Sequence, residues 1–430
     1  MTVRVSATRN VGSEYVSRTV ANMDIYVATT GDDVLGTGAV GAPYATIERA
    51  LEDVPSVVDH VVHIHVAAGA YTEFPDVIDN VVTASGQIVI DGSAALADVT
   101  TGLAIAGGGW AVKLAGVAGV ITEASGGLTP DAFRNKFIQF TDGPRAGLLA
   151  TVAKNTATEI TMGCYATAPA AGNAFKIVEP GVNITVAKDI TVKGNVALVG
   201  IDFDNTSYLL TVEDGSKFVT ACTTIECGGP GGFDEGVIVN DAAVVCGFGQ
   251  SLSASDVAAL QTTDESASAF DCLVLVYGEL QAALVDGGVF TRRSAVVDKC
   301  ASRDGYLYVE YPNANAYLSD IYRDSTNYGL YLRTKSEAFV QGLFVEAGSD
   351  AVYLSNGCTV HLESLDGTAA NVSGHSVMVG RGAKVVAKKS ACTLVGTSGQ
   401  VGWVNGAASV AWPNQDVAVT DAVDATVVGV

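Results

Sequence analysis

The pattern of apolar and polar positions repeats at an offset of 22 residues in the segment 316–354, AYLSDIYRDSTNYGLYLRTKSEAFVQGLFVEAGSDAVYL. When this segment is shifted by 22 positions, apolar residues fall on apolar residues and an acid falls on an acid. The matches are Ala316–Leu318 with Ala338–Val340, Ile321–Tyr322 with Leu343–Phe344, Tyr331–Leu332 with Tyr353–Leu354, and Asp324 with Glu346. Each unit holds two or three apolar runs of about four residues separated by Gly, Asn, Asp or Ser, which predicts short strands.

The same repeat of short apolar runs extends in both directions, with small changes in the length of the repeat unit. Residues 352–354 are matched by 377–379, and 357–362 by 382–387. Earlier segments with the same two or three strand-like runs are 183–203, 207–226, 236–248 and 273–290. Helical repeats need longer helical periodicity, propeller blades need about 40 residues, and the Leu–Asn frame of leucine-rich repeats is absent. The repeat therefore predicts an all-β parallel β-helix with about 22–25 residues per rung.

The segment before the repeats predicts a strand and a short helix over 25–55, then an alternating strand over 60–73. Ile47 and Leu51 lie on one face of this helix. The segment resembles the pectate-lyase-like β-helix family, whose members open with a P-[FY]-x-T-I-x-x-A helix and a V-x-V-x-x-G-x-Y first rung. The matching residues are Pro43, Tyr44, Thr46, Ile47, Ala50, Val66, Gly69 and Tyr71. The resemblance implies a right-handed parallel β-helix whose open sheet edge is covered by the helix.

One region interrupts the repeat. Residues 104–181 contain alternating strands with turn signals at TDGPRAG, AKNTAT and APAAGN, which predict a small antiparallel β-barrel inserted into the stack. The sequence of this region resembles barrel inserts that recur in structural proteins of tailed bacteriophages. The expected organisation is an N-terminal docking arm (1–24), the capping helix and first rungs (25–103), the barrel (104–181), the parallel β-helix (182–402) and a C-terminal strand segment (403–430).

Composition and charge restrict the partners. Hydrophobic residues make up 48% of the chain and charged residues 16%, so a large core is expected. The formal net charge of −22 repels phosphate backbones and anionic lipid, so neither a nucleic acid nor a membrane is an expected partner. The N-terminal segment lacks the apolar run of a signal peptide, so secretion by the standard route is not expected.

No cofactor or metal ion is expected. The eight cysteines include no CxxC pair, and they are predicted to be buried reduced thiols. HVVHIH (60–65) looks like a ligand cluster, since His63 and His65 share one strand face, but an ordinary solvated face of an alternating strand is the favoured interpretation. The paired aspartates in TTGDDVLG (29–36) are predicted to form a turn, and the sequence has no D-x-D-x-D-G loop.

The segment 303–333 is the candidate binding region, because it holds seven of the 15 tyrosines with charged residues between them. Aromatic faces stack on sugar rings, while Arg and carboxylate groups hold hydroxyls and acidic sugars. The alternative interpretation is an aromatic ladder along one face, with the charges simply solvated. The glycan-binding candidates are Arg303, Asp304, Tyr306, Tyr308, Tyr311, Asp320, Tyr322 and Arg323.

Catalysis by this region would need two carboxylates about 5–10 Å apart across a glycosidic bond. Asp324 and Glu346, one repeat apart, meet that condition on neighbouring strands, and Glu310 is a further candidate. Any two acids one period apart pass the same test. The Asp-rich motifs of pectin methylesterases and polygalacturonases are absent, so the catalytic residues stay unassigned.

The function predicted from the sequence is a structural protein on the particle surface of a tailed phage, either a tail spike or fibre or a capsid decoration protein. Residues 1–24 would dock to other virion proteins, and the β-helix would project and adhere to host-surface glycan. Resemblance to phage β-helix spikes implies a homotrimer, with 403–430 as an oligomer clasp. A polysaccharide depolymerase on the same β-helix is the first alternative, and a cellular pectate-lyase-like enzyme is the second.

Overall fold

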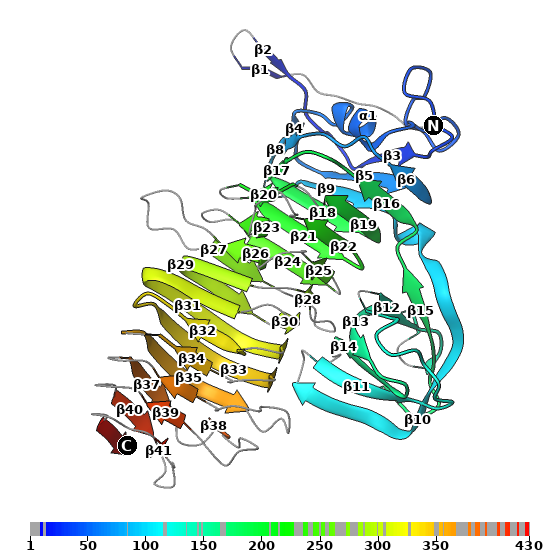
Figure 1. Cartoon of the computed structure of the whole chain (residues 1–430). Helices are drawn as coiled ribbons and strands as arrows, with labels where there is room; N and C mark the ends of the chain where they lie inside the picture. Colours follow the sequence, from blue (N-terminus) through cyan, green and yellow to red (C-terminus); the bar gives the residue numbers. More distant parts are fainter. Residues whose placement is uncertain are drawn as a thin grey trace.

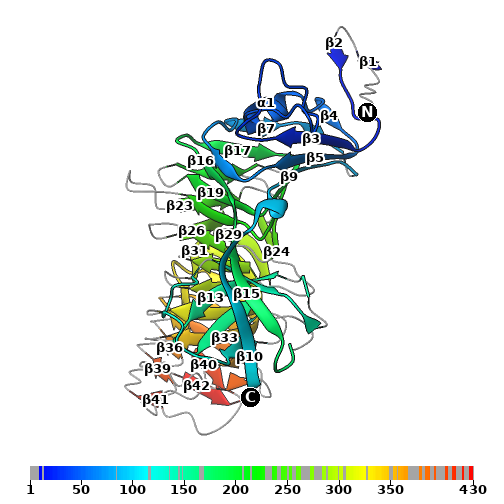
Figure 2. The same cartoon turned by 90° about the vertical axis from the view of Figure 1, so that its right-hand side faces the viewer.

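The chain folds into a long series of short parallel strands with a closed antiparallel barrel beside it (Figure 1). The parallel strands are stacked one after another from the N-terminal end of the molecule to the C-terminal end, and the barrel lies alongside this stack (Figures 1 and 2). This computed structural model describes residues 9–11, 14–83, 85–114, 118–134, 136–143, 146–147, 149–163, 169–205, 208–213, 216–227, 235–239, 244–248, 251–253, 258–262, 272–275, 283–286, 289–298, 300–303, 307–325, 328–347, 352–355, 357–366, 377–379, 383–387, 392–393, 402–404, 409–412, 419–420 and 426–429.

The 32 described strands that pair in parallel are called the parallel stack here. From β16 to β26 each strand pairs with the third strand along the chain, so that β16 pairs with β19, β17 with β20 and β18 with β21. From β27 onward many strands pair with the second strand along, as β31 does with β33 and β32 with β34. The first strands of the stack are β3 (Met23–Val27), β5 (Val61–Val66), β6 (Gly69–Tyr71), β7 (Val77–Asp79) and β9 (Gln87–Asp91).

The next strands are β16 (Val182–Thr185), β17 (Ile190–Lys193), β18 (Asn195–Val199), β19 (Ile201–Asn205), β20 (Leu210–Val212), β21 (Lys217–Ala221), β22 (Thr224–Cys227), β23 (Glu235–Val239), β24 (Val244–Phe248), β25 (Ser251–Ser253), β26 (Ala258–Thr262), β27 (Cys272–Leu275), β28 (Ala283–Asp286), β29 (Val289–Asp298) and β30 (Cys300–Arg303). The last strands are β31 (Leu307–Ser325), β32 (Leu330–Leu332), β33 (Glu337–Ala347), β34 (Val352–Leu354), β35 (Thr359–Asp366), β36 (Val377–Val379), β37 (Lys384–Ala387), β38 (Cys392–Thr393), β39 (Gly402–Val404), β40 (Ser409–Trp412), β41 (Val419–Thr420) and β42 (Thr426–Gly429). Two small sheets lie outside the stack, the antiparallel pair β1 (Arg9–Val11) with β2 (Glu14–Val16), and the parallel pair β4 (Val57–Val58) with β8 (Val81–Val82).

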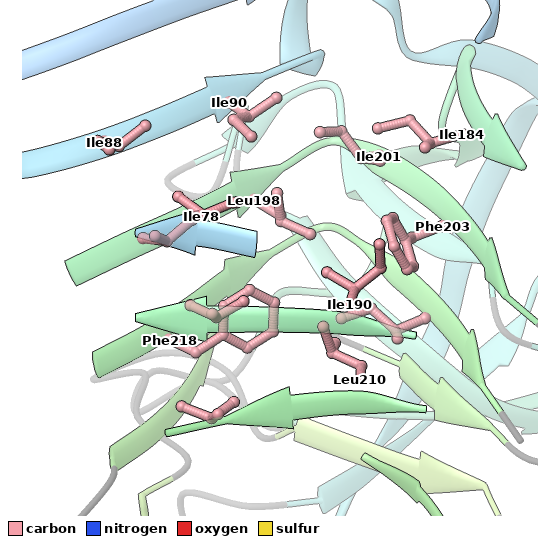
Figure 3. Packing of buried hydrophobic residues seen from close by; sticks show 14 of the residues in the cluster. Ile78, Ile88, Ile90, Ile184, Ile190, Leu198, Ile201, Phe203, Leu210 and Phe218 are labelled. Atoms are coloured by element: carbon pink, nitrogen blue, oxygen red, sulfur yellow. The ribbon is translucent and has the colours of Figure 1, made fainter. Parts of the chain in front are cut away.

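The core of the stack consists of columns of apolar side chains, because the register places equivalent residues side by side on neighbouring strands. Ile25 is in register with Ile64, Ile64 with Ile90, and Ile90 with Leu198, and all four side chains are buried. Figure 3 shows Ile90 and Leu198 among neighbouring apolar side chains of the same interior. Burying one such side chain contributes about 1.5–3 kcal/mol, and branched residues suit the pleated strand.

The 22-residue repeat predicted the strand register correctly. Strands β31 and β33 pair in parallel with Asp324 opposite Glu346, and β32 pairs with β34 with Tyr331 opposite Tyr353. The matches of 352–354 with 377–379 and of His361 with Val386 are also register pairs. In this parallel stack, therefore, residues separated by the repeat length lie next to each other on neighbouring strands.

The predicted helix is present as α1 (Ile47–Glu52), and it lies next to β3 at the N-terminal end of the stack (Figure 1). Thr46 caps it, because its hydroxyl accepts a hydrogen bond from the Arg49 N–H at 3.1 Å. Ile47 and Leu51 are buried on the face predicted from the sequence. Within the described residues, neither α1 nor the 3₁₀ turn η1 (Ser93–Ala95) has the length and apolar content that a membrane span requires.

The closed barrel contains six strands in the order β10–β11–β14–β13–β12–β15. Their bounds are β10 (Ala97–Leu114), β11 (Ala118–Glu123), β12 (Phe137–Phe140), β13 (Leu149–Asn155), β14 (Glu159–Gly163) and β15 (Ala174–Glu179). The all-β class and the small antiparallel barrel predicted from the sequence are therefore confirmed. β10 begins at Ala97, ahead of the expected boundary at 104, because its first part already pairs with β15.

The barrel interrupts the sequence of the stack but not its pairing. The chain leaves the stack after β9 and returns at β16, which pairs with β6, while β17 pairs with β7 and β18 with β9. β10 and β15 lead away from the N-terminal end of the stack, and the barrel lies beside later strands, with β10 near β31 and β13 near β28 (Figure 1). The strands before and after the 90-residue insertion therefore pair as direct neighbours. The insertion costs little free energy, because the entropy of loop closure grows only slowly with loop length.

The C-terminal segment 403–430 adds strands to the end of the stack. β39 pairs with β36, β40 pairs with β37, and β41 and β42 pair with β39 and β40. The described strands of this segment therefore pair within the same chain.

Candidate functional site

An aromatic ladder crosses three neighbouring strands of the stack. The Tyr317 ring on β31 stacks on Phe339 of β33 with centroids 5.1 Å apart and planes at 10°, and Phe339 stacks on His361 of β35 at 4.5 Å and 9°. The neighbours of Tyr317 in sequence, Ala316 and Leu318, are buried, whereas Tyr317 itself is 48% exposed. Alternation along the strand therefore turns the ladder outward.

The ladder has one polar attachment and one open end. The His361 Nε2 lies 2.7 Å from Glu337 Oε1, which fixes the last ring. On the other side, Tyr317 is in register with Val296 of β29, a much smaller residue. About half of the Tyr317 side chain is exposed and available for stacking.

A second aromatic group lies on β32, β34 and the residues just before β32. The rings of Tyr331 and Tyr353 meet edge to face at 4.7 Å, and Tyr328 lies 4.9 Å from Tyr353. The Arg333 guanidinium lies 5.6 Å from the Tyr331 ring centroid. Burial and the neighbouring tyrosines raise the pKa of Tyr331, so its hydroxyl stays protonated at neutral pH.

The register extends this second group into a longer column of positions. Tyr308 pairs with Tyr331, and Phe290 pairs with Tyr308. In the other direction Tyr353 pairs with Met378, and Met378 pairs with Trp403. Large flat or flexible apolar residues therefore recur on successive strands at this one position, as an extended ligand with repeating units would require.

The charged candidates of the same region also meet in the register. Arg303 of β30 pairs with Asp324 of β31, and Asp324 pairs with Glu346 of β33, so three ionisable residues follow one another on adjacent strands. Glu310 pairs with Arg292 of β29. The structure describes the backbone positions of these residues.

The remaining predicted residues fall in several places. Tyr322 is in register with Phe344, and Arg323 with Val345, whose side chain is fully buried. Tyr311 and Asp320 lie in β31. Asp304 and Tyr306 lie outside the described residues.

The paired aspartates of the opening loop form a turn, as predicted. Asp32 Oδ1 accepts hydrogen bonds from the backbone N–H groups of Val34 and Leu35, both at 2.8 Å. Asp33 Oδ1 accepts from the N–H groups of Ala45 and Thr46 at 2.7 and 3.1 Å. Both carboxylates are thus engaged with backbone, which fixes the loop that leads into α1.

On the first strands, the two histidines that the sequence places on one strand face lie together with an aspartate that the sequence did not indicate. His63 and His65 occupy the outer face of β5, as predicted, and their rings stack at a centroid distance of 4.0 Å. The His65 Nε2 lies 3.0 Å from Asp24 Oδ1 on β3, and the His63 Nε2 lies 2.8 Å from Asp91 Oδ2 on β9. Asp24 was not predicted to join this cluster. Strands β3 and β5 pair across the loop and α1, and no sequence repeat marks that pairing.

Comparisons with known proteins give only distant similarities. No protein-family model matches this chain, and no curated protein matches it. Among solved structures, it is similar to XylC in complex with xylose, with 12% identity, 89% of this chain and 75% of that chain covered, and a TM-score of 0.25. It is also similar to the tailspike protein gp49 from Pseudomonas phage LKA1, with 11% identity, 92% and 68% of the two chains covered, and a TM-score of 0.22. TM-scores of this size do not establish a shared fold, so the function has to be argued from the chain's own residues.

Proposed function

We propose that this chain is a structural protein of a tailed-phage particle, in which a right-handed parallel β-helix displays an aromatic surface that binds host-surface glycan. The β-helix is supported by the three-strand pairing interval and by the resemblance of the segment from Pro43 to Tyr71 to the opening of pectate-lyase-like β-helices. The phage assignment is supported by the resemblance of the barrel region to inserts of phage structural proteins.

The observation that carries the adhesion proposal is the ladder of Tyr317, Phe339 and His361. Exposed aromatic rings in an aqueous surface have an unfavourable contact with water, and a sugar face that covers them removes apolar area from water. Tyr317 is the ring with the largest described exposure in the ladder. It therefore serves as the stacking platform, and the rings behind it hold it in position.

Polar recognition would come from the charged positions nearby. Arg303, Asp324 and Glu346 follow one another on adjacent strands about 4.8 Å apart. In this proposal Arg303 binds an acidic sugar or a hydroxyl, and the two carboxylates accept hydrogen bonds from sugar hydroxyls. Asp304, Tyr306, Tyr308, Tyr311, Asp320 and Tyr322 remain proposed members of the same surface. Arg323 is not proposed as a member, because it is in register with the buried Val345.

The adhesion proposal is tested by binding of the purified full chain to an array of bacterial surface polysaccharides. Tyr317→Ala should weaken binding to any glycan that the wild type retains by at least tenfold, the equivalent of about 1.4 kcal/mol. Tyr208→Ala is the matched control, since Tyr208 is a half-buried tyrosine between β19 and β20, many strands away from the ladder. Equal binding by the Tyr317 variant and the wild type would contradict the proposal.

A polysaccharide depolymerase is the second candidate function, and the observation that favours it is the register of Asp324 with Glu346. Carboxylates on adjacent parallel strands lie close to the 5–5.5 Å separation of retaining glycosidases. Asp324→Asn and Glu346→Gln should then abolish the release of reducing ends, even at polysaccharide concentrations that saturate binding. Binding without any release of reducing ends by the wild type would leave adhesion alone.

In the assembly that we propose, three copies form the particle-bound state, residues 1–24 contact other virion proteins, and 403–430 holds the copies together. Among the described residues, β41 and β42 pair on one side, with β39 and β40, and a strand edge that has no partner favours association with another chain. Light scattering on a sizing column should give about three chain masses for the wild type. Deletion of 403–430 should give monomers or aggregates, and a truncated chain that remains trimeric would rule out the clasp.

A further inference from the structure

Three side chains on the outer face of the first strands bring metal-binding atoms together. Asp24, His63 and His65 each offer one ligand atom, and these atoms all lie within 4.8 Å of one another. The His65 Nε2 and Asp24 Oδ1 are already 3.0 Å apart. Two donors of a tetrahedral ion bound at about 2.0–2.1 Å stand about 3.3 Å apart, so this pair needs almost no movement.

The parallel register is the reason for this arrangement. Asp24 is in register with His63, and Tyr26 is in register with His65. The hydrogen bond from His65 to Asp24 therefore runs diagonally between neighbouring strands and holds the His65 imidazole beside the Asp24 carboxylate. Because β3 and β5 are fixed by the buried Ile25 and Ile64, the spacing of the donors is set by the core.

The rings are also held in orientation. The His65 ring stacks on the Tyr26 ring with centroids 4.7 Å apart, and it also stacks on the His63 ring with centroids 4.0 Å apart. Asp91 contacts the His63 Nε2 at 2.8 Å and accepts the Ser93 N–H at 2.8 Å. A carboxylate that holds one nitrogen of an imidazole fixes the ring and leaves the other nitrogen to an ion, which is the usual outer-shell arrangement of metal-binding histidines.

We propose that Asp24, His63 and His65 form a site for a divalent transition-metal ion of the zinc type, with Asp91 as a positioning residue for His63. Two imidazoles and one carboxylate match the ligand preference of Zn²⁺ and related ions, whereas Ca²⁺ and Mg²⁺ require mainly oxygen ligands. Both histidine side chains are about one-third exposed, at 32% and 33%, so an ion can reach the site from solvent. The net charge of −22 raises the local concentration of cations.

The ion would connect β3 to β5 at the N-terminal end of the stack. Asp24 belongs to β3, the first strand of the stack, which directly follows the segment proposed to contact other virion proteins. An ion that binds the folded stack and not the unfolded chain stabilises this end by mass action. Its remaining coordination positions are open to water or to a donor atom of a neighbouring chain.

The test is zinc binding by the full chain after treatment with a chelator and removal of that chelator. Titration calorimetry with ZnCl₂ should give one ion per chain, with no comparable binding of CaCl₂ or MgCl₂, and saturating zinc should raise the melting temperature. His65→Gln and Asp24→Asn should each abolish this binding, and Asp91→Asn should weaken it by about 10–100-fold. Far-UV circular dichroism of each variant verifies that it is folded.

His361→Gln is the matched control for zinc binding. His361 is also about one-third exposed, lies 2.7 Å from a carboxylate and stacks on an aromatic ring, but the described structure groups no second histidine with it. This variant should bind zinc as the wild type does. No zinc binding by the wild type, unchanged binding by folded His65→Gln, or an equal loss in His361→Gln would each overturn the proposal.

Discussion

Phe137 of the barrel packs against Cys222 of the parallel stack, and both side chains are buried. Val178 of β15 completes this small cluster, with Leu96 and Leu149 at its margin. The barrel and the stack therefore share an apolar contact of their own, separate from the two cores. Cys222 lies in a bend directly after β21, with a φ of 51°.

The first prediction concerns this contact. Burial raises the pKa of the Cys222 thiol to about 12, so it should resist alkylation in the native protein at pH 8, because the thiolate is the reactive form. Phe137→Ala should destabilise the barrel contact by roughly 3–5 kcal/mol and increase the alkylation rate of Cys222. Mass spectrometry of the peptide that contains Cys222 measures the rate, with Cys358, buried within the stack, as the internal control. An unchanged rate at Cys222 would mean that the barrel does not protect it.

The second prediction concerns Asp202, which lies on β19 near the barrel. Burial raises the pKa of this carboxyl, and the charges of Asp204 and Glu179 add to the effect against the opposing hydrogen bond from Thr224. A raised pKa means that the folded state favours the protonated acid, so this contribution to stability is present at acid pH and is lost as the pH rises through the folded pKa. Asp202→Asn, neutral at every pH, should therefore raise the free energy of unfolding at pH 7.

Denaturant titration at several pH values measures this effect. The advantage of Asp202→Asn over the wild type should shrink as the pH falls through the raised folded pKa of Asp202 toward the usual aspartate pKa of about 3.9. Asp204→Asn is a comparison on the same strand. A loss of stability at pH 7 in Asp202→Asn would show that the ionised carboxylate is favourable where it lies.

The third prediction concerns Glu123, the buried acid at the end of β11. Burial alone would raise its pKa, but hydrogen bonds from the N–H groups of Ser125 and Gly126, at 3.0 and 2.7 Å, outweigh it and lower the pKa. A lowered pKa contributes stability above the unfolded pKa, and this is lost as the pH falls through the folded pKa. Glu123→Gln should therefore destabilise the barrel by roughly 1–3 kcal/mol at pH 7 and by less in acid.

Hydrogen exchange of the barrel amides, compared with those of the stack, locates this loss. Faster exchange in β10 and β11 of Glu123→Gln, with unchanged exchange in β3 and β5, is the expected result. Glu159→Gln is the control, since Glu159 is an exposed acid on the neighbouring strand β14. Equal protection of the barrel in Glu123→Gln and the wild type would mean that the loop needs no carboxylate.

Much of the stack could be predicted from the sequence because parallel pairing converts an offset into a neighbour. The 22-residue match of Tyr317 with Phe339 gave both the strand register and the ladder partner, and only its outward direction needed the structure. The helix α1 could also be predicted, because the residues that form its cap and its apolar face lie within a few positions of one another in the sequence.

The barrel order and the histidine cluster could not be predicted in this way. In the barrel, β14 lies between β11 and β13, and β12 lies between β13 and β15, so no fixed offset gives the partner. Asp24 meets His65 only because β3 pairs with β5 across the loop and α1. Alternation tells which face a side chain takes, but it does not tell which strand lies alongside.

The last prediction concerns Thr220, a fully buried residue of β21 in the inward column that contains Leu198. Its hydroxyl has no hydrogen-bond partner among the described residues, so it carries a desolvation penalty in the apolar core. Thr220→Val replaces the hydroxyl with a methyl group of nearly the same shape and should stabilise the chain by about 1 kcal/mol. Thr211→Val is the control, because Thr211 is a partly exposed threonine on β20 and should change little. Equilibrium unfolding in urea measures both, and a loss of stability in Thr220→Val would reveal that the hydroxyl is hydrogen-bonded in solution.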